Sequence, residues 1–298
     1  MTNQLMSDKA IEPALVNPML LDSYLKQLRL PGFLNHWRSF AVDAANSNLS
    51  YDRFLLALAE QEVARREQNG REQRIKSAHF PVIKELADFD FTAIPKLNRS
   101  KVLQLAESGY IPKAESVIMI GVPGVGKTHI ATSLGIQACR QGYRVRFYNA
   151  AALVNELIQA QDDHRLSKFL TSVSKQQLII IDELGFIPFS SAGSHLMFQF
   201  FSNLYERVSM MVTSNLSFAD WTQVFGDERL TAALLDRLTH RAHILEFVGD
   251  SYRFRQRMKK QKHDAHPDTH NDEYDEKNSR EVGAVSYTHL RAHETVLD

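Results

Sequence analysis

Hydrophobic residues recur at a helical spacing in the first quarter of the chain. Three apolar stripes, spaced by three or four residues, run over Leu21–Leu28, Phe33–Ala44 and Tyr51–Val63. Ser50 stands where an N-cap of the third helix is expected. The pattern predicts a small all-helical N-terminal domain over residues 1–75. We expect its aromatic residues to form a core; a surface that stacks on nucleotide bases is the alternative.

The pattern changes after residue 113, where short apolar runs alternate with helical periods. The predicted strands are 116–121, 144–149, 178–181, 208–213 and 242–248. Strands that alternate with helices predict a five-stranded parallel sheet between helices, an α/β domain over residues 114–262. Residues 76–113, which include Pro81, Pro95 and Pro112, are predicted to be a connector that packs against this domain.

Beyond Ser251 the hydrophobic pattern is lost. Residues 253–262 are dense in arginine and lysine, which indicates a basic helix or arm. Residues 263–281 are polar and largely acidic, so they cannot bury a core and are predicted to be disordered. Residues 282–298 match neither part and resemble a peptide added by read-through into vector sequence. The tail 263–298 is therefore excluded from the fold.

Composition narrows the cellular context. The 298 residues contain 35 basic and 35 acidic side chains, so nucleic-acid binding would need a local basic surface. One such candidate is the segment 64–76, for which a solvated helix face is the default and a phosphate-contacting face the alternative.

A single cysteine, Cys139, excludes an internal disulfide and fits a reducing compartment. Without a signal peptide or an apolar stretch of about 20 residues, we expect a cytoplasmic protein outside the membrane.

The strongest local motif lies between the first predicted strand of the sheet and the helix after it. Residues 121–128 match G-x-x-x-x-G-K-[ST], the phosphate-binding P-loop. Its glycines let backbone N–H groups converge on phosphate oxygens at the positive end of the helix. Lys127 is expected to reach the β- and γ-phosphates of ATP, and the hydroxyl of Thr128 to hold Mg²⁺. A strand–helix turn without a ligand would not require Lys and Thr at these positions.

Two acids follow the third predicted strand. Asp182 and Glu183 come directly after four aliphatic residues. Adjacent carboxylates at the end of a buried strand repel each other and lose hydration, which is costly without a function. We expect Asp182 to hold the Mg²⁺ shell and Glu183 to polarise the water that attacks the γ-phosphate. The pair therefore favours ATP hydrolysis over a kinase reaction.

Two further residues are candidates for catalysis. Asn215 follows the fourth predicted strand and could orient the attacking water or a γ-phosphate oxygen; the alternative is a helix cap, for which Ser217 competes. Arg237 follows Asp236 on an amphipathic helix, where a surface ion pair is the default. If Arg237 instead reaches the site of a neighbouring subunit, it would stabilise charge on the transferring phosphoryl group.

Several motifs together resemble one protein family. They are the P-loop and the segments Leu28–Phe33, Ile181–Gly185, Val212–Asn215, Val224–Asp227, Leu235–Leu238 and Ser251–Arg253. Over residues 20–262 the chain is similar to the IstB-type transposition helper ATPases of insertion sequences, which belong with the DnaC-type helicase loaders in the AAA+ superfamily. The resemblance implies a P-loop AAA+ core whose C-terminal lid is here reduced to the short basic segment.

The resemblance also implies roles and partners. Asn215 takes the sensor-1 place, Arg237 the arginine-finger place and Arg253 the sensor-2 place. It implies binding to double-stranded DNA, an ATP-dependent homo-oligomer with shared sites, and a transposase encoded by the same element. A replicative helicase loader and a DNA clamp that hardly hydrolyses ATP are the alternatives.

The predicted site is thus a set of three overlapping groups. The catalytic residues are Lys127, Asp182, Glu183, Asn215 and Arg237; the metal ligands are Thr128 and Asp182; the ATP-binding residues are Gly121, Val122, Pro123, Gly124, Val125, Gly126, Lys127, Thr128, His129 and Arg253.

Overall fold

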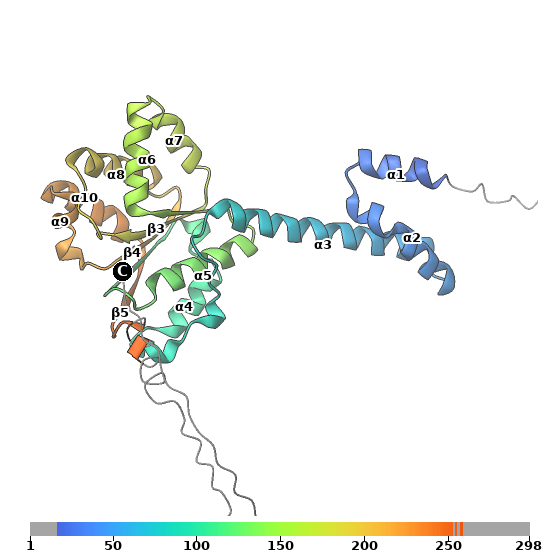
Figure 1. Cartoon of the computed structure of the whole chain (residues 1–298), viewed down its shortest axis with the longest axis horizontal. Helices are drawn as coiled ribbons and strands as arrows, with labels where there is room; N and C mark the ends of the chain where they lie inside the picture. Colours follow the sequence, from blue (N-terminus) through green and yellow to red (C-terminus); the bar gives the residue numbers. More distant parts are fainter. Residues whose placement is uncertain (1–16, 253, 255–256, 259–298) are drawn as a thin grey trace, which may run out of the picture. The chain divides into compact units, whose positions relative to one another are not determined.

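The structure, a computed structural model, describes residues 17–252, 254 and 257–258 (Figure 1). The chain divides into a first unit, Met1–Gln256, which holds every element described below, and a second unit, Arg257–Asp298. Arg253, most of the predicted basic arm 253–262 and the whole predicted tail 263–298 lie outside the described residues.

Three helices form the N-terminal region, as the apolar stripes predict. They are α1 (Pro18–Gln27), α2 (Pro31–Asn46) and α3 (Tyr51–Ala78). Helices α1 and α2 both begin at a proline, which has no N–H to leave unpaired and a backbone angle already suited to a helix. Helix α2 packs along α3 and against α1. Helix α3 continues across residues 75 and 76, where a domain boundary is predicted; that boundary stays a prediction.

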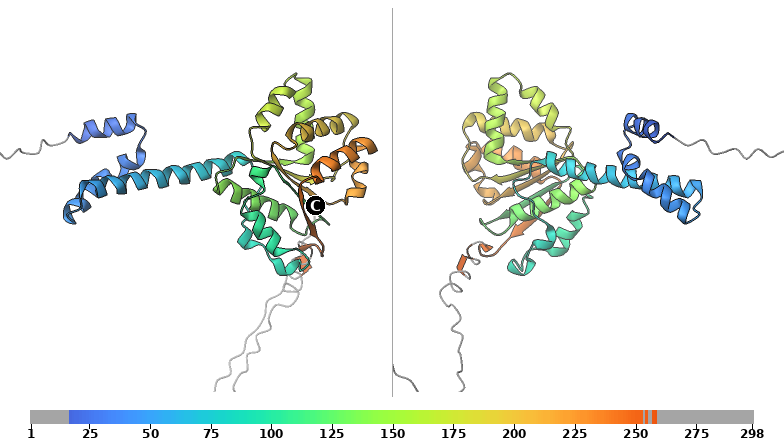
Figure 2. Two further views of the ribbon diagram at one scale, coloured as in Figure 1. Left: turned by 180° about the vertical axis from the view of Figure 1, so that it is seen from behind. Right: turned by 45° about the vertical axis from the view of Figure 1, so that its right-hand side comes forward.

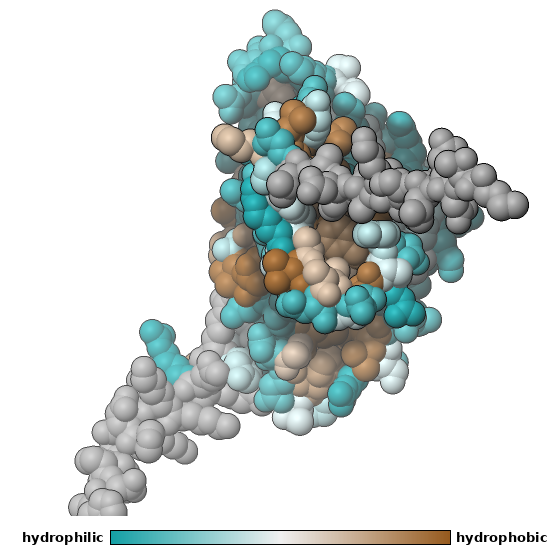
Figure 3. Space-filling view, turned by 90° about the vertical axis from the view of Figure 1, so that its right-hand side faces the viewer, coloured by the Kyte–Doolittle hydropathy of each residue, from teal (hydrophilic) through white to brown (hydrophobic). Residues whose placement is uncertain are grey.

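Much of the apolar surface of these helices is not buried. Leu25 and Leu58 are buried, whereas the side chain of Tyr51 is 93% exposed, so the predicted aromatic core is wrong at that residue. The other exposed large hydrophobic residues of these helices and of the turns between them are Met19, Leu20, Tyr24, Leu28, Val42, Leu49, Leu55, Leu56 and Val63. Figure 3 shows one face of the molecule, on which brown, hydrophobic patches lie among teal, hydrophilic ones.

A buried acid joins α2 to α3. Glu62 on α3 accepts a hydrogen bond from the backbone N–H of Gly32 at 2.5 Å, in the first turn of α2. Its other carboxylate oxygen accepts from Nε of Arg66 at 2.6 Å, and Arg66 also donates to the carbonyl of Arg29. Glu62 therefore satisfies an N–H that the start of a helix leaves unpaired, and it does so with a charge that suits the helix dipole.

The basic segment 64–76 is partly used for internal contacts. Besides Arg66, Arg71 forms an ion pair with Glu67 at 3.6 Å, and Arg74 donates to the backbone carbonyl of Cys139 at 2.7 Å. These contacts give three of its cations a structural role. Contact of this helix face with phosphates stays a prediction.

The second part of the unit is a five-stranded sheet with every pairing parallel, which confirms the predicted fold class. Its strands are β1 (Ser116–Gly121), β2 (Val145–Asn149), β3 (Leu178–Leu184), β4 (Ser209–Ser214) and β5 (Ala242–Phe247). Their order is β2-β3-β4-β1-β5, so β1, which leads into the P-loop, lies between β4 and β5. The predicted strands differ from these bounds by at most three residues at an end.

Helices cover both faces of the sheet (Figures 1 and 2). The helices of this part are α4 (Arg99–Ala106), α5 (Lys127–Arg140), α6 (Ala150–Asp162), α7 (Leu166–Val173), α8 (Ser191–Leu204), α9 (Thr222–Phe225) and α10 (Glu228–Thr239). Alternate residues of β3 enter two cores: Ile179 and Ile181 pack with α6–α10, and Leu178 and Ile180 with α4 and α5. Among the described residues, no helix is both long and apolar enough to cross a membrane.

The connector 76–113 lies against α5. It contains the short helices η1 (Leu86–Asp88), η2 (Phe91–Ala93) and η3 (Ile111–Lys113), in addition to α4. Glu85 forms a two-bond ion pair with Arg140, at 2.6 and 2.8 Å. Ser133 donates to the carbonyl of Lys84 at 3.0 Å. These contacts hold the connector along the helix that follows the P-loop.

Candidate nucleotide site

The P-loop joins β1 to α5 in a conformation that depends on glycine. Gly124 and Gly126 have φ angles of 81° and 97°, in the left-handed region that residues with a Cβ rarely adopt. A Cβ at Gly126 would lie 2.6 Å from the ring of Phe89. The two glycines therefore permit both the curl of the loop and the close approach of the connector.

Lys127 and Thr128 open α5, where the helix dipole favours anions. The side chain of Lys127 is only 8% exposed, and its Nζ donates to the carbonyls of Gly121 and Val122 at 2.6 and 2.9 Å. These bonds hold the ammonium group against the loop. The hydroxyl of Thr128 lies 3.0 Å from each carboxylate oxygen of Asp182, so the predicted metal ligands are adjacent.

A cavity of about 580 Å³ opens above the P-loop. This volume lies in the range of ligand-binding pockets. On the side of the P-loop and α5, its lining comprises Pro123, Gly124, Val125, Gly126, Lys127, Thr128, His129 and Thr132; the connector side comprises Pro81, Val82, Lys84, Asp88, Phe89, Asp90, Ala93 and Ile94. Glu183, Phe186, Thr213, Asn215 and Tyr252 also line it.

His129 is held by the connector. Its Nε2 lies 2.9 Å from the carbonyl oxygen of Glu85, and its ring meets that of Phe89 edge-on at 5.3 Å between centroids. His129 is therefore part of the wall that the connector and α5 build together, next to the P-loop.

The two acids of β3 occupy different environments. Asp182 is 5% exposed, and burial raises the pKa of its carboxyl; hydrogen bonds from Thr213 and Thr128 oppose this shift. Glu183 is exposed and lines the cavity, and its Oε2 accepts from Nδ2 of Asn149 at 2.9 Å. The buried carboxylate of Asp182 is held in place and suits a metal ligand. The exposed carboxylate of Glu183 can contact a water molecule in the cavity.

Sequence reasoning missed two residues of this region, Asn149 and Thr213. Asn149 ends β2 beside Asp182, and its Oδ1 also accepts from the N–H of Ala151 at the start of α6. A signal for it existed, because Asn149 ends a predicted strand just as Asn215 follows one. Thr213 contacts both acids and also ends a predicted strand, 208–213, but its contacts depend on an irregularity in the pairing of β3 with β4 that the sequence does not indicate.

Asn215 lies at the cavity and does not cap a helix. The cap position of the next short helix, η4 (Phe218–Asp220), is Ser217. Within the described part of the chain, Oδ1 of Asn215 is buried without a hydrogen-bond partner. A buried unpaired oxygen is unfavourable, so this atom is suited to a ligand or water in the cavity.

Arg237 is not brought together with the other predicted site residues. It lines a separate cavity of about 40 Å³ beside Ser116 and Met210, at the amino ends of β1 and β4. Its guanidinium lies 4.6 Å from the ring centroid of Phe198, and its Nη1 is buried without a hydrogen-bond partner among the described residues. No ion pair joins it to Asp236 in that part of the chain, so the default interpretation is not supported.

The segment before Arg253 lies against the P-loop. The backbone N–H of Tyr252 donates to the carbonyl of Gly124 at 3.0 Å, and Tyr252 lines the cavity. Arg253 itself lies outside the described residues, so its nucleotide contact stays a prediction.

These residues fit ATP and Mg²⁺. The glycine loop, the ammonium of Lys127 and the start of α5 suit phosphate groups. The hydroxyl of Thr128 and the carboxylate of Asp182 are oxygen donors of the kind that Mg²⁺ prefers. No group of three or more His, Cys, Asp or Glu side chains suited to a metal occurs in the described ranges.

The fold and the site define a P-loop ATP-binding protein. The family model described as IstB-like ATP binding protein matches residues 23–260, and the chain belongs to this family. A Pseudomonas aeruginosa protein assigned as the ATP-binding protein of insertion sequence IS21 is 38% identical over 239 residues, which are 80% of this chain and 90% of that one. A Geobacillus stearothermophilus protein assigned likewise to insertion sequence IS5376 is 35% identical, over 80% and 94% of the two chains.

Solved structures show remoter similarity. The DnaC helicase loader superposes with a TM-score of 0.44 at 19% identity, over 50% of this chain and 87% of that one. DnaA from Aquifex aeolicus bound to AMPPCP superposes with a TM-score of 0.49 at 20% identity, over 62% and 56% of the two chains.

Proposed function

We propose that this protein is a Mg²⁺-dependent ATPase that assembles on double-stranded DNA and helps a transposase of the same insertion sequence to capture its target. The hydrolysis part rests mainly on one observation: the consecutive acids Asp182 and Glu183 both reach the P-loop region, one bonded to Thr128 and the other lining the cavity. A protein that only binds nucleotide has no need of a second acid there.

Each residue has a distinct task in this proposal. Lys127 and the P-loop N–H groups bind and orient the phosphates. Thr128 and Asp182 would hold Mg²⁺, which neutralises phosphate charge when bound. Glu183 accepts a proton from the attacking water, and Asn149, bonded to its carboxylate, orients it. The unpaired oxygen of Asn215 accepts a hydrogen bond from that water, whereas its amide NH₂ group would donate to a γ-phosphate oxygen.

Arg237 completes the site of a neighbouring subunit in this proposal. The nucleotide cavity lies at the carboxyl ends of the strands and Arg237 at their amino ends, and a six-residue strand such as β1 spans about 16 Å. Arg237 therefore cannot act on the nucleotide of its own chain. A head-to-tail oligomer would bring the two ends together, and such an arginine is worth roughly 10³–10⁵ in rate.

The DNA and transposase parts rest on the family. The relatives are assigned to insertion sequences, which supports a transposase as the partner and the cytoplasm as the place of action. Co-purification separates this proposal from a replicative helicase loader: we expect the transposase of the same element to be retained and a hexameric helicase to be absent. Retention of the helicase alone would contradict the transposition role.

Glu183→Gln tests the hydrolysis. Because the amide cannot accept the proton of the water, we expect the steady-state ATPase rate with duplex DNA to fall at least about 100-fold. ATP binding and ATP-dependent growth in particle size on DNA, followed by light scattering, should persist. Glu156→Gln, an exposed glutamate on α6, is the matched control. Wild-type protein without ATPase activity, even with DNA, would refute the enzyme.

A further inference from the structure

The strand that carries the two acids is irregular where they lie. Ile181 pairs with Val212, and the next pair is Leu184 with Ser214. Between these pairs β3 has two residues, Asp182 and Glu183, and β4 has one, Thr213. Two residues opposite one is the definition of a β-bulge, a feature that often re-aims side chains next to active sites.

The bulge solves a geometric problem of consecutive acids. In a regular strand, neighbouring side chains point to opposite faces of the sheet. Here Asp182 bonds to Thr128 while Glu183 lines the cavity, so both serve the same region. Glu183 has a φ of 62°, in the left-handed region that residues other than glycine rarely adopt. Some contact has to hold it there.

Thr213 makes that contact with both acids. Its side chain is 1% exposed, and its Oγ1 accepts from the backbone N–H of Glu183 at 2.9 Å. The same hydroxyl donates to Oδ1 of Asp182 at 2.5 Å. The hydroxyl of Ser214 then donates to the carbonyl of Leu184 at 2.7 Å. Side-chain hydroxyls of β4 thus replace the ladder bonds that the bulge interrupts.

We infer that Thr213 is a positioning residue, whose hydroxyl fixes the backbone of Glu183 and the carboxylate of Asp182 in one arrangement. Its only proton goes to Asp182, so it acts through the acids and donates nothing to the nucleotide. This inference rests on the proposed ATP hydrolysis at the same site. It assigns to the P-loop site a residue from the middle of the sheet, between β3 and β1.

Thr213→Val and Thr213→Ser distinguish the role of the Thr213 hydroxyl from the role of its side-chain packing. Valine keeps the shape but leaves the N–H of Glu183 without an acceptor and Asp182 without a donor; serine keeps both bonds. For valine we expect kcat to fall about 10–100-fold with KM for ATP within about threefold, because displacement of the catalytic groups affects chemistry more than nucleotide binding. For serine we expect kcat within about threefold of wild type.

Amide hydrogen exchange at Glu183 gives a readout that does not need activity. Loss of its acceptor should speed exchange of this amide at least about tenfold in the valine protein and leave it near wild type in the serine protein. Thr231→Val is the matched control, because Thr231 is an equally buried threonine on α10 whose hydroxyl bonds to the carbonyl of Asp227. It should change neither kcat nor exchange at Glu183.

Three results would overturn the inference: unchanged exchange at Glu183 in the valine protein, unchanged kcat there, or equal losses with serine. If the valine protein does not fold, Thr213→Ala removes the same hydroxyl with less crowding and is judged by the same criteria. An inactive wild type would refute the proposed hydrolysis, and the exchange measurement would still decide whether Thr213 holds Glu183.

Discussion

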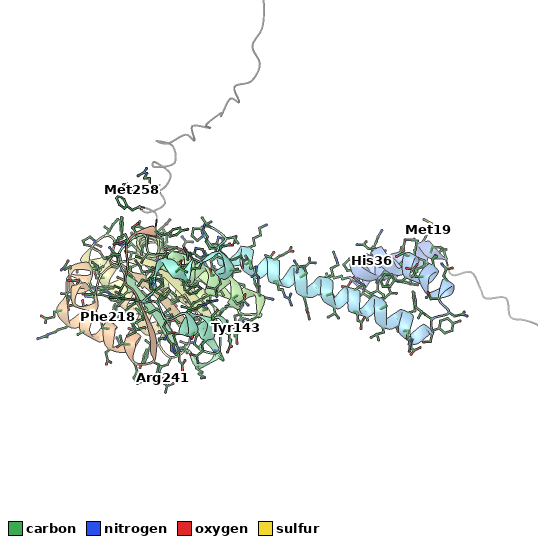
Figure 4. All side chains as sticks on the ribbon, turned by 90° about the horizontal axis from the view of Figure 1, so that it is seen from below. Met19, His36, Tyr143, Phe218, Arg241 and Met258 are labelled. Carbon is green, nitrogen blue, oxygen red and sulfur yellow. The ribbon has the colours of Figure 1, made fainter. Side chains whose placement is uncertain are left out.

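The two ends of the sheet differ in charge and in what they can bind. At the carboxyl ends of the strands, the P-loop, Glu183 and Asn215 line a cavity large enough for a nucleotide, and the buried Asp182 bonds to Thr128 beside it. At the amino ends, a cavity of about 40 Å³ is bordered by Lys113, Arg237 and Arg241, and Arg241 lies at the surface (Figure 4). One chain thus carries phosphate-binding groups and a cation-rich face that cannot meet within it. This difference between the two ends supports the proposal that a complete site forms only when subunits associate.

Substitution of Arg237 by alanine tests directly whether neighbouring subunits share a site, and it has the largest expected effect. If the cation acts across a subunit boundary, kcat of the assembled protein should fall roughly 10³-fold while ATP affinity stays within about twofold. Arg241→Ala removes the same charge from the same end and is the control. The measurement is the ATPase rate on duplex DNA, with ATP affinity determined separately.

A mixture of two variant proteins gives a stricter test of the shared site. Arg237→Ala subunits retain Glu183, and Glu183→Gln subunits retain Arg237. A mixture of the two inactive proteins should recover part of the activity, because some interfaces pair an intact acid with an intact arginine. Absence of recovery in mixed oligomers, or an Arg237→Ala protein at wild-type rate, would contradict a shared site.

Lys127, the cation at the carboxyl ends of the strands, is expected to affect ATP affinity, and its effect is smaller than that of Arg237. Lys127→Ala removes an ammonium that is expected to bond to phosphate, so ATP affinity should weaken roughly 100-fold. Lys113→Ala, at the amino ends, should leave affinity within about twofold. Calorimetry with ATP and Mg²⁺ measures both. Equal affinity in the Lys127→Ala protein would refute the P-loop assignment.

The smallest effect concerns stability. Burial raises the pKa of Asp182 above its ordinary value of 3.8, so between these two values the folded chain keeps a proton that the unfolded chain has released. This contribution to stability is present at low pH and is lost as pH rises through the raised pKa. Asp182→Asn removes the buried charge, and we expect about 1 kcal/mol of added stability at pH 7.5 without nucleotide.

Thermal unfolding across pH checks this expectation. The Tm advantage of Asp182→Asn should shrink as pH falls toward 4, because wild-type Asp182 then becomes neutral too. Asp162→Asn, an exposed aspartate at the end of α6, should change Tm little at any pH. If the Tm advantage of Asp182→Asn grew as pH fell, it would contradict a pKa of Asp182 that is raised by burial.

Local pattern was sufficient for the sheet and for half of the site. The apolar runs predict all five strands, and the placement of Thr128 beside Asp182 follows from strands that end at one edge. The contact of Thr213 could not be predicted, because it depends on a bulge that shifts pairing by one residue. The N-terminal stripes predict the helices but not their burial, since a stripe does not show what covers it. Tyr51 and its exposed neighbours illustrate this limit.

The buried acid between α2 and α3 has a consequence for how this sequence can vary. A Cβ at Gly32 would lie 2.6 Å from the carboxylate of Glu62 and 3.0 Å from its Cα. Any larger residue at 32 therefore displaces the acid, and loss of the acid leaves the N–H of Gly32 without this acceptor and Arg66 with only its bond to the carbonyl of Arg29. Positions 32 and 62 should therefore covary: homologues that lose the glycine should also lose the glutamate.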